Sequence, residues 1–284
     1  MIIVTFGALG AVVASFVGAE GAFIGNFIEG LSGIQLDNWQ VTYIVGGCLG
    51  LFLLLLRVGT IESTYFENME QNKNIQKGNL KILFYNKKNF IKYLHCIVIG
   101  IPIWYVVGLL VMNSKDNFAP LMGINDIENG QAVMYTYIGL SVGDLISGVL
   151  SQWLRSRKKV VGLYLLFTLV LITSFLFFID GVSKDTYYLM CFLLGTATGY
   201  WALFVSIAAE QFGTNIRSTT ANTIPNFVRG SVNLIMLGFG LLTALNLGDA
   251  ISAYIVGLAF ILLALYSLSQ LKETFGKDLD YFET

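Results

Sequence analysis

Apolar residues fall into eight long runs along the chain, separated by short polar segments. The runs cover about 2–24, 39–56, 91–112, 132–154, 160–179, 187–208, 221–245 and 250–270. A membrane-spanning helix needs about 20 predominantly apolar residues, and each run is close to that length. The first run lacks the basic region that precedes the apolar core of a signal peptide, so we interpret it as a span. The pattern predicts an all-α integral membrane protein with eight transmembrane helices.

The composition agrees with this class and narrows the functions. The chain of 284 residues is 55% hydrophobic and 12% charged, and its mean hydropathy is +0.70. Soluble domains carry roughly 25% charged residues. The sequence contains no H-E-x-x-H, P-loop, nucleophile elbow or Cys/His cluster, so we predict no catalytic residue, no metal and no cofactor.

The positive charges predict the orientation. An even number of spans places both termini on one side, and all 17 Lys and Arg residues except Lys115, Lys184 and Arg229 fall there. Because Lys and Arg are retained in the cytoplasm, we expect both termini to be cytoplasmic and the protein to lie in the inner membrane of a bacterium. The basic, apolar stretch Asn79–Tyr93 is expected to form an amphipathic helix on the lipid surface rather than a nucleic-acid site.

Two runs carry polar stripes at helical spacing. One stripe holds Asp144 and the other holds Arg229, and a charge inside the bilayer should face protein or water rather than lipid. Their members are Tyr137, Ser141, Asp144, Gly148 and Ser151, and Asn222, Asn226, Arg229 and Asn233. Their spacing of three and four residues puts each set on one helix face. We expect Arg229 about two turns from the cytoplasmic end of its span.

Two interpretations of these stripes stay open. In the first, the stripes line a solute pathway in which Asp144 couples a proton or cation and Arg229 contacts an anion. In the second, Asp144 and Arg229 form a structural ion pair.

A segment of small residues and aromatics lies within the sixth run. Gly195 and Gly199 are four residues apart, which allows close helix approach or bending. Tyr200 and Trp201, which follow directly, either line a binding site or pack against neighbouring helices, and packing is the favoured interpretation.

Four polar segments together resemble motifs of the major facilitator superfamily. The segment GVLSQWLRSRKK (148–159) matches its turn motif at Gly148, Leu150, Arg157 and Lys159, whereas Gln152 replaces the usual Asp and Arg155 the usual Gly. RVGTIES (57–63), AEQFGTNIRSTT (209–220) and KETFGKDLDYFE (272–283) resemble three further motif segments, with Ile61 and Lys272 at positions where proline is usual. The pattern of these four segments resembles that of the sugar-porter and metabolite–proton symporter branches of the superfamily.

The resemblance implies a domain organisation and a set of gating charges. The eight runs would correspond to helices five to twelve of a twelve-helix fold. Residues 1–57 would hold the last two helices of one half, 58–90 the cytoplasmic loop between halves, 91–271 the complete second half, and 272–284 a cytoplasmic tail. The cytoplasmic gating charges implied are Glu62, Arg155, Arg157, Lys159, Glu210, Arg217 and Glu273.

The resemblance also implies the function. We expect a secondary transporter that moves a small polar solute by alternating access, with Asp144 as a candidate for proton coupling. The expected pathway residues are Asp144, Arg229, Asn226, Asn233, Tyr137, Ser141, Tyr200 and Trp201. The expected partners are the solute, a proton, the lipid bilayer and a complementary N-terminal fragment, without which the chain should not transport efficiently. A non-transporting membrane sensor or subunit, or a degenerate transporter fragment, is the alternative, and nucleic acid is not expected.

Overall fold

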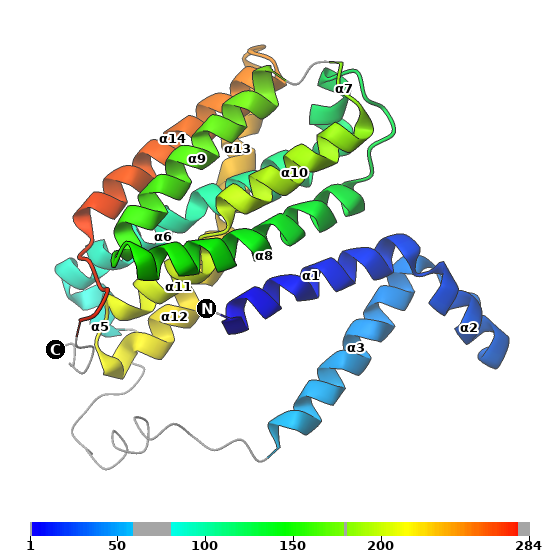
Figure 1. Ribbon diagram of the computed structural model, residues 1–284, viewed down its shortest axis with the longest axis horizontal. Coiled ribbons are helices and arrows are strands. Elements are labelled where there is room, and N and C mark those ends of the chain that lie inside the picture. Colours follow the sequence, from blue (N-terminus) through cyan, green and yellow to red (C-terminus); the bar gives the residue numbers. More distant parts are fainter. Residues whose placement is uncertain (1, 59–80, 179–180, 278–284) are drawn as a thin grey trace.

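The computed structural model describes residues 2–58, 81–178 and 181–277, in which every regular element is a helix (Figure 1). The helices are α1 (Ile2–Glu20), α2 (Ala22–Ser32), α3 (Asn38–Arg57), α5 (Lys81–Tyr85), α6 (Lys87–Trp104), η1 (Tyr105–Val111), η2 (Ser114–Phe118), α7 (Ala119–Leu121), α8 (Asn129–Trp153), α9 (Arg157–Phe177), α10 (Lys184–Thr198), α11 (Trp201–Glu210), α12 (Thr214–Gly230), α13 (Val232–Ala244) and α14 (Asp249–Gln270). Within the described ranges, 7 stretches are long and apolar enough to cross a membrane, or 8 if a bent pair of helices counts as one span. The predicted all-α membrane class therefore agrees with the fold.

The first predicted span is not one straight helix. The chain turns at Gly21, and the flanking segments Leu9–Gly18 and Ala22–Gly30 are bent by 63°. In Figure 1, α1 runs along α8, whereas α2 and α3 project away from the remaining helices. Only 6% of the apolar window of α3 is buried within the chain. Side chains of α3 are therefore available to lipid or to another protein.

The predicted surface helix over residues 79–93 is also corrected. Within the described part of this stretch, α5 ends at Tyr85, and Asn86 caps α6 by accepting a hydrogen bond from the Lys88 amide at 3.1 Å. The span thus begins earlier than its apolar run, because tertiary contacts hold its first turns. Tyr93 in these turns is buried, and its hydroxyl donates to Thr223 Oγ1 at 2.8 Å.

The spans between residues 87 and 270 pack into one bundle with two apolar core clusters. One cluster lies near η2 and α7 and includes Phe118, Phe175 and Tyr187. The other lies toward the turn between α8 and α9 and includes Phe204 and Phe212. The polar site described below lies where three of these spans lose their regular helical geometry.

Each of the three irregular spans has a local cause. Pro102 in α6 cannot donate an amide hydrogen bond, and the helix changes to the wider π-helical pattern of η1 from Tyr105. The span of α10 and α11 breaks at Gly199, whose ψ of 45° departs from helical geometry. The span of α12 and α13 is interrupted by one turn residue, Ser231, whose hydroxyl donates to the Val228 carbonyl at 2.6 Å, while its own amide and carbonyl keep the helical hydrogen bonds.

Glycines bring α8 and α10 into backbone contact. A Cβ atom on Gly143 would lie 2.9 Å from the Cα atom of Gly199, and Cβ atoms on Gly139 or Gly195 would overlap backbone atoms of the facing helix. The predicted close approach at Gly195 and Gly199 is therefore confirmed. This contact sets the distance between Asp144 on α8 and the break that begins α11.

Candidate functional site

A cavity of about 350 Å³ opens between α1, α6, η1, α8, α11 and α12. Its lining is mostly apolar, with one tyrosine, two tryptophans and one arginine. The residues are Gly7, Ala11, Ile103, Trp104, Val107, Tyr137, Leu140, Trp201 and Arg229. Three of the predicted pathway residues, Tyr137, Trp201 and Arg229, therefore share one cavity.

Arg229 is the cationic group of this cavity. Its guanidinium carbon lies 5.2 Å from the ring centroid of Trp201 and 6.0 Å from that of Trp104. Its Nη1 donates to Asn226 Oδ1 at 3.1 Å. An arginine cation is attracted to the faces of aromatic rings at such distances. The cation is thus positioned by two indole rings from different helices.

The helix that holds Arg229 begins earlier than its apolar run. The span runs over 31 residues, Thr214–Ala244, and Arg229 is its central residue. The apolar run began only at residue 221 because the first turns of α12 are polar. About four helical turns, rather than two, therefore separate Arg229 from the first residue of the helix.

The aromatic and cationic residues of the cavity lie beside the helix irregularities. Trp104 is the last residue of α6, Trp201 is the first residue of α11, and Arg229 is the second-to-last residue of α12. Discontinuous helices inside membrane proteins are tolerated where they are buried in protein or line a cavity. Their ends also present backbone polar groups to solutes in transporters.

Asp144 does not line this cavity. Its side chain is fully buried, and Oδ1 accepts a hydrogen bond from the backbone amide of Ala202 at 2.9 Å. Because Ala202 is in the first turn of α11, its amide has no partner within that helix. Oδ2 has no hydrogen-bond partner among the described residues. Asp144 thus joins α8 to the broken end of α11.

The ion pair between Asp144 and Arg229, the second of the two interpretations left open, is not formed among the described residues. Arg229 instead bonds Asn226 and lies against two tryptophans, while Asp144 bonds a backbone amide. The two stripes have different environments. The stripe of α8 is mostly buried in the bundle, whereas Asn226, Arg229 and Asn233 are exposed.

The remaining predicted pathway residues are not among the lining residues of this cavity. Ser141 Oγ donates to the Tyr137 carbonyl within α8 at 2.9 Å. The Tyr200 side chain is fully buried, and its hydroxyl donates to the Ile99 carbonyl at 3.0 Å. This is the packing role favoured for Tyr200 from the sequence. Asn226 contacts the site through Arg229, and Asn233 lies beyond the break on α13.

Trp104 is the site residue that the sequence analysis missed. It falls within an apolar run and off both polar stripes. The available signal was its position two residues after Pro102, because a proline within a span marks a point where the helix changes.

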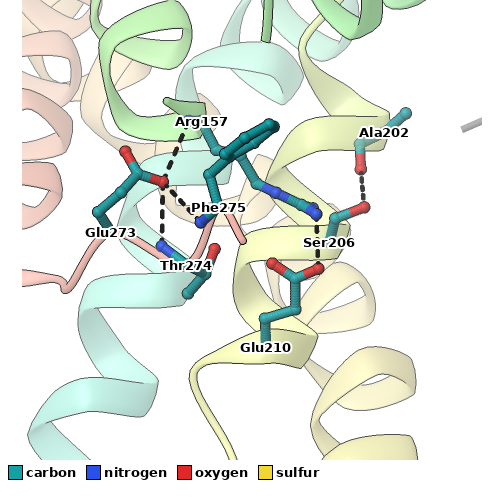
Figure 2. Close-up of polar contacts among 7 residues, drawn as sticks. All are labelled: Arg157, Ala202, Ser206, Glu210, Glu273, Thr274 and Phe275. Atoms are coloured by element: carbon teal, nitrogen blue, oxygen red, sulfur yellow. Dashed lines mark hydrogen bonds and ion pairs between the residues drawn. The ribbon is translucent and has the colours of Figure 1, made fainter. Parts of the chain in front are cut away.

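Four of the predicted gating charges, Arg157, Glu210, Arg217 and Glu273, lie close together, and Figure 2 shows three of them, Arg157, Glu210 and Glu273. Arg157 at the start of α9 and Glu210 at the end of α11 form an ion pair of 2.8 Å, and both side chains are largely shielded. Arg217 lies near enough to Glu210 to act on it electrostatically. Its Nε also donates to the Phe212 carbonyl at 3.3 Å.

Glu273, in the segment that follows α14, caps the first turn of α9. Its carboxylate accepts hydrogen bonds from the Ser156 hydroxyl and from the amides of Arg157 and Lys158 at 3.1 and 3.2 Å. The amides of Thr274 and Phe275 bond the same carboxylate at 3.0 and 3.1 Å (Figure 2). Partial burial by itself would raise the pKa of Glu273, but these hydrogen bonds outweigh it and the pKa is lowered.

Two other predicted gating positions, Arg155 and Lys159, lie in or beside the turn between α8 and α9. Arg155 has φ 47°, the left-handed conformation that favours glycine, and it stands where the resembling motif has glycine. Lys159 has an exposed side chain, and its amide donates to Ser156 Oγ at 3.2 Å. Glu62 lies outside the described residues.

No family model matches this chain, and no curated protein matches its sequence. What the chain does is therefore inferred from its own residues.

Proposed function

We propose that this chain is a secondary transporter of a small polar solute, of the major facilitator type, which binds the solute in the cavity at Arg229. The observation that carries the proposal is the placement of Trp104, Trp201 and Arg229 together at the irregular points of three spans. Such points are where helices can bend and where transporters hold their solutes. Arg229 is the contact for a negatively charged group of the solute.

The cytoplasmic cluster is assigned the role of a gate. The ion pair between Arg157 and Glu210 joins α9 to the end of α11, and Glu273 joins the segment after α14 to α9. Alternating access requires contacts that hold one end of the cavity shut and then release. These contacts connect the cytoplasmic ends of three spans, so in this proposal they hold that end of the cavity shut until they release.

Asp144 is assigned to proton coupling through its second oxygen. Oδ1 holds the amide of Ala202, whereas Oδ2 has no partner among the described residues. A proton on Oδ2 would leave the bond from Ala202 in place. Accumulation of solute against a gradient by an Asp144→Asn variant would contradict this role.

Solute uptake tests the proposal directly. Membrane vesicles from native cells would be prepared with the chain present, with the chain deleted, and with Arg229→Gln in its place. A labelled sugar, monocarboxylate, dicarboxylate and zwitterionic amino acid serve as probes. We expect uptake of at least one probe that requires the chain and is lost in Arg229→Gln, with Lys115→Gln as the matched control.

Equal uptake of every probe with and without the chain would contradict a transport function. Binding without uptake would favour the alternative, a membrane sensor or subunit. Proteoliposomes that contain only this chain test the separate expectation that a complementary fragment is needed, since uptake there would contradict it.

A further inference from the structure

We infer that the solute is a monoanion with a flat apolar body, such as an aryl-substituted monocarboxylate. The inference rests on the proposed solute site and names the class of molecule that the cavity fits. It follows from the charge, the shape and the size of the cavity.

The charge of the cavity requires one negative group. Arg229 is the charged residue of the lining, and no carboxylate is among the lining residues. The guanidinium has five donors, and its one hydrogen bond among the described residues goes to Asn226. Because Arg229 is exposed and lines the cavity, a single carboxylate can reach its remaining donors and form charge-assisted hydrogen bonds with it. A second negative charge on the solute would have no partner there.

The remaining lining favours a flat apolar body. Two indole rings flank Arg229, and the rest of the wall is apolar except for Tyr137, the one other lining residue with a polar side-chain group besides the indole N–H groups. Aromatic rings pack favourably in offset or edge-to-face arrangements against other aromatic rings. A sugar would leave most of its hydroxyl groups without partners on such a wall, and unpaired buried hydroxyl groups cost binding energy.

The size of the cavity limits the length of the solute. A volume of about 350 Å³ is at the lower end of the range for small-molecule sites. Water occupies about 30 Å³ per molecule in the liquid, so the cavity has room for on the order of ten non-hydrogen atoms. 3-Phenylpropionate, with a carboxylate on a short chain from one ring, meets all three criteria.

Intrinsic fluorescence can report binding at this site. The chain contains 4 tryptophans: Trp104 and Trp201 line the cavity, whereas Trp39 and Trp153 are exposed elsewhere. Replacing Trp39 and Trp153 by Phe leaves only the two cavity reporters. The full chain with these two changes, in detergent micelles, would be titrated with four probes of graded chemistry. The probes are 3-phenylpropionate, its neutral amide 3-phenylpropionamide, phenyltrimethylammonium and succinate.

We expect saturable quenching by 3-phenylpropionate. The amide, the ammonium ion and succinate should bind at least about tenfold more weakly, because each lacks either the charge-assisted bonds to Arg229 or the apolar body. Arg229→Gln should abolish the preference for the acid over the amide. Arg229→Lys should keep part of it, since lysine retains the charge but not the planar group. Lys115→Gln should leave every titration unchanged.

The other outcomes refute the inferred class of solute, or they show that solute class and transport function do not stand or fall together. Equal binding of the amide or of the ammonium ion would refute the anionic class, and tighter binding of succinate would refute the apolar body. Quenching by 3-phenylpropionate without uptake would leave the inference standing and refute the transporter. Uptake of a sugar or an amino acid without binding of 3-phenylpropionate would refute the inference and leave the transport function standing. If Arg229→Gln does not keep the size-exclusion profile of a folded protein, two comparisons still test the inference. They are the binding of the four probes to the chain with Arg229 intact and the binding of the same probes to Arg229→Lys.

Discussion

Replacing Gly143 by alanine should weaken both the packing of α8 and the polar contact that holds the broken end of α11. A Cβ atom there would lie 2.9 Å from the Cα atom of Gly199 and closer still to the Thr196 carbonyl. Carbon atoms in contact prefer about 3.5–4.0 Å, so the helices must separate by about 1 Å. Both obstructing groups are backbone, so no side chain can rotate away to make room.

The magnitude follows from three contributions. Overpacking a well-packed core costs about 1–3 kcal/mol. A separation of about 1 Å would take the 2.9 Å bond between Asp144 and Ala202 beyond hydrogen-bonding range. Loss of a bond to a charged group costs about 1.5–3 kcal/mol. Alanine in place of glycine returns about 1 kcal/mol of helix propensity. The net free energy of unfolding should fall by about 2–5 kcal/mol.

The matched control is Gly240→Ala in α13. Nothing lies within 4 Å of a Cβ atom at Gly240, so this change gains helix propensity and meets no obstruction. Unfolding would be followed by circular dichroism in mixed micelles with increasing sodium dodecyl sulfate. Hydrogen–deuterium exchange would report the amide of Ala202, which should exchange faster in Gly143→Ala alone. If Gly143→Ala unfolds at the same detergent fraction as Gly240→Ala, or later, the contact between α8 and α10 does not hold the site as described.

Three further changes test single features. Arg155→Gly should stabilise the fold by about 1 kcal/mol in the same titration, because a left-handed non-glycine residue is strained, whereas Arg155→Ala should not. Glu273→Gln at pH 7 should speed amide exchange in the first turn of α9. The pKa of Glu273 in the folded protein is lowered from its usual value of 4.5. The ionised carboxylate therefore stabilises the fold above pH 4.5, and this stabilisation is lost as the pH falls through the lowered pKa. Amide exchange in the first turn of α9 of the wild type should become faster over that range. Unchanged exchange in either experiment would contradict the cap. Asp144→Asn keeps an acceptor for Ala202 and should be nearly neutral for stability, whereas Asp144→Leu should cost about 1–3 kcal/mol, and equal losses would show that the hydrogen bond is not what Asp144 contributes.

The contacts among Arg157, Glu210 and Glu273 connect segments that only the motif resemblance had grouped. The segments that hold Arg157, Glu210 and Glu273 were grouped by their likeness to family motifs, and the fold brings all three together. Arg157 and Glu273 are 116 positions apart in the sequence. Without the motif resemblance, each of these residues is an ordinary loop charge, and nothing in the local pattern pairs them.

The sequence alone determined the class of the protein and the approximate position of its spans, because transfer into a bilayer depends on local apolar length. It also determined which residues share a helix face, since that depends only on the helical period. The tertiary structure decided what each face meets. Asp144 and Arg229 carry opposite charges on similar stripes, yet one is buried against α11 and the other lines a cavity with two tryptophans. The bond between Asp144 and the Ala202 amide and the role of Trp104 depend on contacts between distant segments, which hydropathy and period do not encode.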